Sequence, residues 1–133
     1  MKKIEVNNLK TIYYDITELY KYDKKTGIQR VTRAIMNELY SKIQFQEYKI
    51  VLIYADGEKG KFYLINSDSE LSYMSLSNQY ITPEKNDIYI CVDLTYNIKQ
   101  NLINELLSFK KSGVKIFYTI YDLIPIRHPE WFE

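Results

Sequence analysis

The stretch KKTGIQRVTR, residues 24–33, joins an expected strand to an expected long helix through a short basic turn with one glycine. Gly27 lets the backbone bend sharply and lets a ligand come close, because glycine lacks the Cβ that forbids positive φ. The helix that follows presents free N–H groups and a positive dipole end, which favour an anion such as phosphate. Arg30 and Arg33 lie on one helical face and add positive charge. The turn therefore predicts either an anion site or an ordinary strand-to-helix joint.

Strand-like segments lie on both sides of this turn. Runs of apolar, β-branched and aromatic residues predict strands at 11–16, 48–55, 61–65, 87–94 and 114–120. The run at 48–55 is nearly continuous, as in a strand buried on both faces. Asp56-Gly57 and Gly60 predict turns, which would make 61–65 the return strand of a hairpin. Residues 17–26 are polar and turn-prone, and the pattern loosens between Asn66 and Asn86, where we expect the most mobile part of the chain.

Two helices are expected between these strands. The first begins near Ile28, and its apolar stripe consists of Val31, Ile35, Leu39 and Ile43. The second spans residues 98–111, has Leu102, Leu106 and Phe109 on one side, and ends at Gly113. Alternating strands and helices predict parallel βαβ units, and hence an α/β fold with a three-layer, Rossmann-like parallel sheet. Ligands of such sheets bind at the carboxyl ends of the strands, where the Gly27 turn and segments 93–95 and 121–128 would meet.

Length and composition place the chain among globular proteins of one domain. It has 133 residues, 46% of them hydrophobic, and a formal net charge of +1, which argues against nucleic acid as the main partner. No apolar run approaches the roughly 18 residues that span a bilayer, and the N-terminus lacks the apolar core of a signal peptide, so we expect a cytoplasmic protein. The lone Cys91 lies within an apolar run and predicts a small buried hydrophobe rather than a disulfide or a zinc site.

Three motifs together resemble a known family. They are residues 15–17 leading to 26–33, residues 87–93, and the segment YDLIPIRHPEWF at 121–132. In this order and spacing they resemble the N-terminal half of bacterial group 1, or family 4, glycosyltransferases, which have the GT-B fold. The resemblance implies a retaining transferase that moves a sugar from a nucleotide-sugar donor to a surface-glycan acceptor such as lipopolysaccharide or capsule.

The resemblance also implies where the donor lies. In that family the glycine turn approaches the donor diphosphate across a cleft between two domains, which assigns Gly27 and Arg30 to the diphosphate. The departing phosphate helps to take the acceptor proton, so the protein need not supply a base, and its main contribution is positive charge. No cofactor and no metal ion are expected. Tyr121 stands where many relatives carry His, so no histidine role is transferred to it.

Four further residues are candidates for the acceptor side of the cleft: Gln29, Asp93, Asp122 and His128. The two aspartates follow predicted strands, where their carboxylates either bind acceptor hydroxyls or cap turns. The histidine lies in a predicted loop, where it serves either the site or a local hydrogen bond.

By the same resemblance, residues 1–133 form the acceptor-side domain, and the donor-binding C-terminal domain is absent from this chain. We therefore expect the chain to be inactive alone and to self-associate through exposed interdomain surface. The partners of the full enzyme would be the nucleotide-sugar and the glycan, with peripheral association at the inner face of the membrane. The alternative is a non-catalytic, truncated module that binds a glycan, a membrane surface or a partner subunit.

Two other classes with parallel sheets fit less well. A Rossmann dinucleotide enzyme needs G-x-G-x-x-G after its first strand, and Gly27 stands alone there. A receiver-type signalling domain, by resemblance, has paired acids after its first strand and a lysine after its last, and neither is present here.

The donor assignment predicts a mutational effect in an enzyme that contains both domains. Arg30→Ala should remove a charge-assisted hydrogen bond worth about 1.5–3 kcal/mol, or about ten- to 150-fold in kcat/KM. Gly27→Val should lose more, since a β-branched side chain resists the turn and blocks the phosphate. Lys49→Ala is the control and should change little. Equal, small effects of Arg30→Ala and Lys49→Ala in folded protein would show that the turn is only a structural joint.

Overall fold

A computed structural model describes residues 9–21, 27–43, 48–67, 73–92 and 99–118 of the chain. The elements in these ranges are, in chain order, β1 (Lys10–Asp15), α2 (Thr17–Lys21), α3 (Gly27–Ile43), β2 (Tyr48–Asp56), β3 (Lys61–Ser67), β4 (Met74–Tyr80), β5 (Ile88–Cys91), α4 (Gln100–Lys111) and β6 (Lys115–Tyr118).

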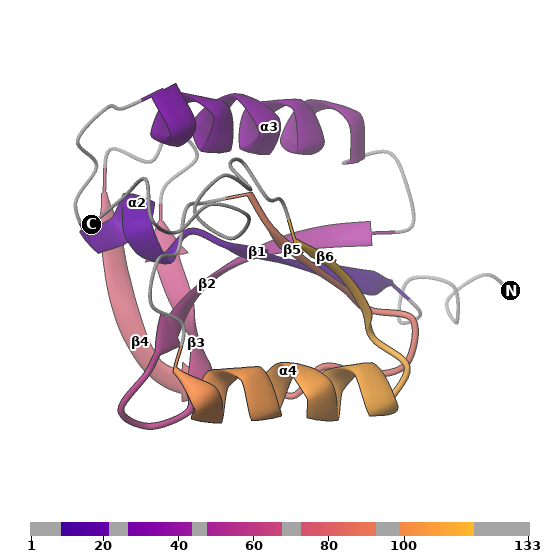
Figure 1. Cartoon of the computed structure of the whole chain (residues 1–133). Coiled ribbons are helices and arrows are strands. Elements are labelled where there is room, and N and C mark those ends of the chain that lie inside the picture. The colour runs from indigo at the N-terminus through magenta and orange to yellow at the C-terminus, as the bar shows by residue number, and fades with distance from the viewer. Residues whose placement is uncertain (1–8, 22–26, 44–47, 68–72, 93–98, 119–133) are drawn as a thin grey trace, which may run out of the picture.

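The strands form one sheet in the order β4-β3-β2-β1-β5-β6. β1 pairs in parallel with β2 and with β5, and β5 pairs in parallel with β6. Helix α3 covers one face of this sheet and α4 the other (Figure 1). This arrangement confirms the predicted α/β class and the three-layer, Rossmann-like sheet. The hairpin strand β3 was also predicted, and it adds an antiparallel part to the sheet together with β4.

The chain changes direction across the sheet at β1. Helix α3 connects β1 to β2 on one side of it, whereas α4 connects β5 to β6 on the other side. Crossovers of the same hand place helices on opposite faces when they run in opposite directions along a sheet, which is the arrangement seen here. β1 and β5 therefore border a topological switch point, and a crevice is expected outside their carboxyl ends.

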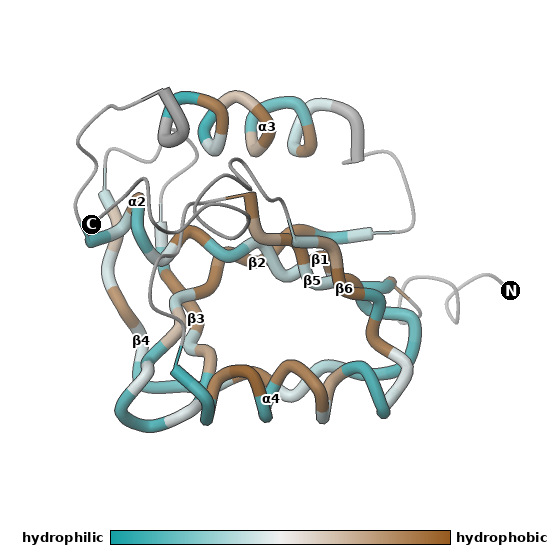
Figure 2. The backbone as a smooth tube through the Cα atoms, viewed as in Figure 1, coloured by the Kyte–Doolittle hydropathy of each residue, from teal (hydrophilic) through white to brown (hydrophobic). Residues whose placement is uncertain are grey.

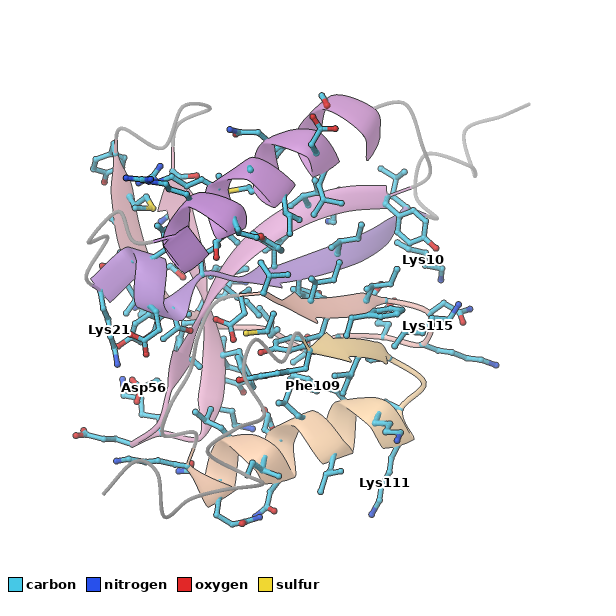
Figure 3. All side chains as sticks on the ribbon, turned by 45° about the horizontal axis from the view of Figure 1, so that its top comes forward. Lys10, Lys21, Asp56, Phe109, Lys111 and Lys115 are labelled. Atoms are coloured by element: carbon cyan, nitrogen blue, oxygen red, sulfur yellow. The ribbon has the colours of Figure 1, made fainter. Side chains whose placement is uncertain are left out.

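The core between the sheet and α4 follows from the spacing of apolar residues, which recur with one period in the strands and with another in the helix. Ile53, Phe62 and Tyr89 point from their strands toward the predicted helix stripe Leu102, Leu106 and Phe109, and all six are buried together. The Phe62 ring lies 5.5 Å from Tyr89 and 5.8 Å from Phe109, centroid to centroid. Figure 2 shows hydrophobic residues along α4 where it meets the sheet, and Figure 3 shows Phe109 between the two layers. Cys91 is fully buried in the same cluster, as predicted.

The core on the other face corrects the predicted stripe of α3. Ile35 and Leu39 pack on this core as predicted, but Val31 is 40% exposed, and among the described side chains of the helix Thr32 and Met36 are the buried ones. The Tyr14 hydroxyl donates to the main-chain oxygen of Thr32 at 2.7 Å, which brings the Thr32 side of the helix against the sheet. The side chain of Ile43 lies outside the described residues.

Two elements were not predicted. Helix α2 occupies the start of the segment 17–26, where we expected only turns, and it forms because the fully buried Leu19 anchors it on the core. β4 lies within the segment 66–86, where we expected the loosest part of the chain. Its sequence, MSLSNQY, is mostly polar because β4 is an edge strand with one neighbour, β3. Burial therefore explains the first element, and one-sided strand pairing explains the second.

The predicted turns are present. Asp56 stabilises the β2–β3 turn, since its carboxylate accepts from the N–H groups of Glu58 at 3.0 Å and Lys59 at 3.1 Å. Gly113 follows the end of α4 with φ of 96°, a conformation that favours glycine. Among the described residues, no helix is both long enough and apolar enough to cross a membrane.

The aromatic cluster predicts a large stability effect at one phenylalanine and a small one at another. Phe62→Ala should lower the free energy of unfolding by about 3–5 kcal/mol, because Phe62 is 1% exposed and joins the sheet to α4. Phe117→Ala is the matched control: Phe117 is 56% exposed, so the change should stay within about 0.5 kcal/mol. Urea denaturation measures both, and similar losses for the two variants would contradict this account of the core.

Candidate functional site

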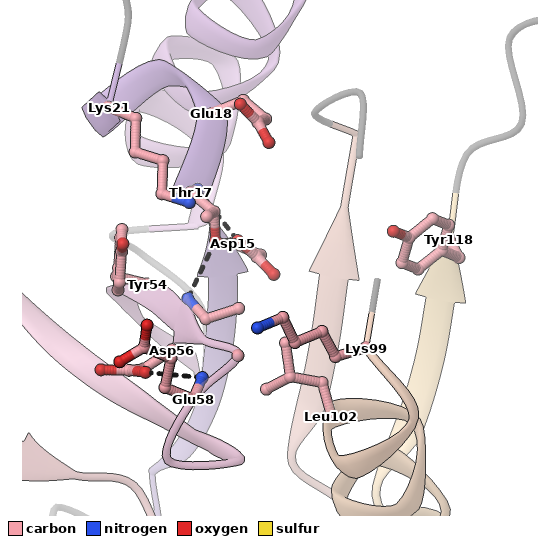
Figure 4. A pocket seen from close by; sticks show the side chains of 12 residues that line it. Asp15, Thr17, Glu18, Lys21, Tyr54, Asp56, Glu58, Lys99, Leu102 and Tyr118 are labelled. Carbon is pink, nitrogen blue, oxygen red and sulfur yellow. Dashed lines mark hydrogen bonds between the residues drawn. The ribbon is translucent and has the colours of Figure 1, made fainter. Parts of the chain in front are cut away.

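A cavity of about 410 Å³ opens at the carboxyl edge of the sheet. Residues from the ends of β1, β2 and β6, from α2, and from the start of α4 line it. Figure 4 shows Asp15 and Lys99 directed into this space from opposite sides, with Tyr54 and Tyr118 at its borders. The cavity therefore lies where the reversal at β1 places the crevice of a doubly wound sheet.

Asp15 is the buried charge at this site, with 3% of its surface exposed. One carboxylate oxygen accepts from the main-chain N–H of Thr17 at 3.0 Å and also from the Thr17 hydroxyl. The other oxygen accepts from the Tyr89 hydroxyl at 2.6 Å. Thr17 Oγ1 in turn accepts from the N–H of Ala55 at 2.9 Å. Asp15 thus connects the end of β1 directly to β5 and, through Thr17, to β2.

Burial and hydrogen bonding act in opposite directions on this carboxyl group. Burial raises the pKa of Asp15 above its ordinary value, and the bonds from Thr17 and Tyr89 partly offset that rise. Burial, together with the nearby Asp15 charge, also raises the pKa of Tyr89 well above 10.0, so its hydroxyl keeps its proton and donates. The arrangement holds a carboxylate at the edge of the cavity in a fixed orientation.

Lys99 reaches the cavity because the β2–β3 turn lies against the start of α4. Asn101 Nδ2 donates to the main-chain oxygen of Gly57 at 2.7 Å. A Cβ at Gly57 would stand 3.0 Å from Lys99 Cδ, so glycine leaves space for the lysine stem. Lys99 is the N-cap residue of α4 and makes no side-chain cap. The turn glycine and the helix start together aim the Lys99 amine into the cavity (Figure 4).

The lining combines both signs of charge with aromatic rings. Glu18, Asp56 and Glu58 accompany Asp15, while Lys21 and Lys99 supply the positive charges. Carboxylates accept from hydroxyl groups and ammonium groups donate to them, so this set suits a ligand rich in hydroxyls. Within the described ranges, no group of three or more His, Cys, Asp or Glu residues is arranged to hold a metal ion.

The predicted site residues divide into two sets. Gly27, Gln29 and Arg30 lie together in the first turn of α3, and Arg30 is exposed. That turn is near the carboxyl edge of the sheet because α3 joins two parallel strands. Arg30 is not among the described residues that line the cavity, and the surroundings of the other two lie outside the described part of the chain. Asp93, Asp122 and His128 lie outside the described residues, and so do Ile124, Trp131 and Phe132 of the expected interdomain surface. Their roles remain predictions.

Sequence reasoning missed Asp15, Thr17 and Lys99 as site residues. The signal for Asp15 was present, because its carboxylate comes at the end of an apolar strand and a threonine follows two residues later. At this spacing the carboxylate can accept a hydrogen bond from the threonine N–H. Lys99 carried no such signal, since any lysine before a helix resembles a solvated charge. Its place depends on contact with a turn more than forty residues earlier in the chain.

The buried carboxyl group predicts a specific pH dependence. Because the pKa of Asp15 is raised in the folded state, its contribution to stability is complete below the unfolded pKa, near 3.8, and is lost as pH rises through the folded pKa. The difference in unfolding free energy between wild type and Asp15→Asn should therefore fall with rising pH, by at most about 1.4 kcal/mol per pH unit.

Tyr89→Phe tests the cause. Loss of its hydroxyl removes a hydrogen bond that lowers the pKa of Asp15, so the pH window in which stability falls should extend upward. Tyr54→Phe is the control, and its profile should match that of wild type. Urea denaturation from pH 3 to pH 8 measures all four proteins at about one-unit steps. A wild-type stability that rises relative to Asp15→Asn across this range would contradict the sign.

Comparison with known proteins gives a consistent relationship. Three Escherichia coli proteins, each described as serotype-specific mannosyltransferase WbdA, are 30% identical to this chain over 118 residues. The match covers 88% of this chain and 14% of each of those proteins, so the chain spans a small part of their length. No protein-family model matches the chain, and no solved structure matches it. Over most of its length the chain is therefore similar to part of a bacterial glycosyltransferase, as its motifs indicated, while membership of group 1 and the GT-B fold stay predictions.

Proposed function

We propose that this chain is the N-terminal, acceptor-side domain of a retaining glycosyltransferase of group 1 with the GT-B fold. The enzyme would transfer a sugar, mannose being the first to test, from a nucleotide-sugar to a surface-glycan acceptor. The observation that carries the proposal is the 30% identity to mannosyltransferase WbdA over 88% of the chain. The Rossmann-like sheet supports it, since GT-B enzymes are built from two such domains.

The cavity at the carboxyl edge supports the acceptor role. Sugar hydroxyls donate to carboxylates, and Glu18 and Asp56 lie on the same side of the cavity as Asp15. Lys99 would donate to a sugar oxygen from the opposite side. A ligand held between these walls has its orientation fixed by several directed bonds, which is what positions one hydroxyl for reaction.

The donor would be held by the start of α3 and by a second domain. Main-chain N–H groups of the first helical turn, with Arg30 beside them, stabilise negative charge on a diphosphate. This turn has no acidic residue that would repel such a group. Charge on the leaving diphosphate grows as the glycosidic bond breaks, so the field acts most strongly in the transition state. A glycan acceptor of this kind would place the enzyme at the inner face of the membrane.

The proposal predicts that the chain alone is an incomplete enzyme. The 133-residue chain should bind a nucleoside diphosphate with Kd above about 1 mM, which is less than about 4 kcal/mol of binding. It should transfer no sugar. The protein that continues into a second α/β domain should bind the nucleotide at micromolar concentration and transfer mannose from nucleotide-activated mannose. Calorimetry and a transfer assay measure these outcomes.

Two results would overturn parts of the proposal. Micromolar nucleotide binding by the 133-residue chain would mean that the donor site is not shared between two domains. No turnover of any nucleotide-activated sugar by the two-domain protein would favour a non-catalytic module. Product anomeric configuration, determined by NMR, decides between retention and inversion.

A further inference from the structure

A row of tyrosines crosses the antiparallel part of the sheet. Tyr54 on β2 pairs in register with Tyr63 on β3, which pairs in register with Tyr80 on β4. Residues directly opposite each other on neighbouring strands project from the same face, so the three rings form a cross-strand row. The Tyr63 and Tyr80 rings meet edge to face at 6.3 Å, and Tyr20 of α2 meets Tyr54 at 5.4 Å. The row therefore starts at the acceptor cavity, which Tyr54 lines, and ends at the edge of the sheet.

Each ring of this row has a lysine over its face. The amine-to-centroid distances are 5.5 Å for Lys21 and Tyr54, 5.3 Å for Lys59 and Tyr63, and 5.4 Å for Lys61 and Tyr80. Lys61 also forms an ion pair with Glu105 at 3.2 Å. These contacts restrict the ring orientations, so the row is organised before any ligand binds.

A shallow second cavity, of about 530 Å³, lies at the far end of the row. Asn78, Gln79, Tyr80 and Thr82 line it. The β3–β4 pairing shifts register between Tyr63 and Ile65, and an irregularity of this kind, such as a bulge, changes the direction of the side chains that follow it on the strand. Ser77 fixes this part of β4, since its Oγ accepts from the N–H of Gln79 at 3.1 Å.

We propose that this edge cavity, with Tyr80 at the outer end of the tyrosine row, forms a second carbohydrate subsite, which holds the part of the acceptor glycan that is already built. The inference rests on the proposed function and makes the acceptor an extended, uncharged oligosaccharide rather than a single sugar. The Tyr80 ring, 51% exposed, supplies an apolar surface for the C–H face of a sugar ring. The amide and hydroxyl groups beside it both donate and accept hydrogen bonds, as sugar hydroxyls require.

The chemistry of the lining selects this occupant. The described side chains that line the edge cavity are all uncharged, and the nearby Lys61 is already paired with Glu105, so the lining favours an uncharged glycan over an anionic lipid or a charged glycan. Two strand spacings separate Tyr54 from Tyr80, which is about 10 Å and within the reach of a short oligosaccharide. Tyr63, in the middle of the row, is 9% exposed, so one glycan chain would contact Tyr80 at one end while its growing end lies in the acceptor cavity.

Titration of the 133-residue chain with mannose oligosaccharides of increasing length tests the subsite. Affinity, measured by NMR, should rise with length once a chain reaches from the acceptor cavity to Tyr80. In Tyr80→Ala the longest oligosaccharides should bind about tenfold more weakly, while the shortest should bind as to wild type. Gln79→Ala, at an exposed position where folding is not at risk, should give a smaller loss with the same dependence on length. Tyr73→Ala is the control, since Tyr73 is 61% exposed near the other end of β4, and it should leave the length dependence intact.

Three results would overturn the inference: affinity that does not depend on length, length dependence that survives Tyr80→Ala and Gln79→Ala, or an equal loss in Tyr73→Ala. Self-association that Tyr80→Ala abolishes, without sugar binding, would instead make β4 an interface between copies. These results are separate from the proposed function, because sugar transfer by the two-domain protein is scored on short acceptors that do not reach Tyr80. Suppose that the two-domain enzyme is active on short acceptors, and that binding depends on oligosaccharide length equally in Tyr80→Ala and in wild type. That result would disprove the second subsite and leave the proposed function intact.

Discussion

The hydrogen bonds that the buried carboxylate of Asp15 accepts are the interactions on which this architecture depends. Three strands reach the carboxyl edge around it, and its bonds to Thr17 and Tyr89 connect all of them. Burying a carboxylate away from water is unfavourable unless hydrogen-bond donors surround it. The end of β1 must therefore adopt the arrangement in which Asp15 meets these donors. The amino end of the same strand has a counterpart, since the buried Asp87 accepts from Thr11 N–H at 3.0 Å and Glu84 N–H at 2.8 Å. The central strand is thereby fixed at both ends by acceptors rather than by apolar packing alone.

This fixation explains why the carboxyl edge is suited to chemistry. Apolar clusters on both faces set the positions of the strands, but they exert no directional force on a polar ligand. The Asp15 network supplies direction, and the same edge has Lys99 oriented by the contact between the β2–β3 turn and α4. Side chains held by packing and by neighbouring hydrogen bonds lose little entropy when a ligand arrives. The rigid parts of the fold and the polar parts of the cavity are therefore built from the same few residues.

The sequence predicted the features that depend on local pattern. The periodicity of Leu102, Leu106 and Phe109 identified the buried side of α4, and Gly113 identified its end, because burial and a positive φ leave direct traces in residue type. Helix α2 was missed because one buried residue, Leu19, decides it. The site was harder still. Asp15 and Tyr89 are 74 positions apart in the sequence, and no local pattern in either segment indicates that the two side chains are in contact. The start of α3 was predicted near Ile28, one residue from its observed start at Gly27.

The hairpin of β3 and β4 stands apart from the parallel strands in one respect. After β4 the chain returns to place β5 beside β1, so the pairing of β1 with β5 does not require the hairpin to have a particular length. Insertions, deletions and substitutions in β4 can therefore accumulate in evolution without disturbing the centre of the sheet, as is general for peripheral segments. Related chains are free to diverge at this edge while they keep a common centre. If the edge cavity binds glycan as proposed, such a division would let related chains change the polymer that they bind by changing only this peripheral hairpin.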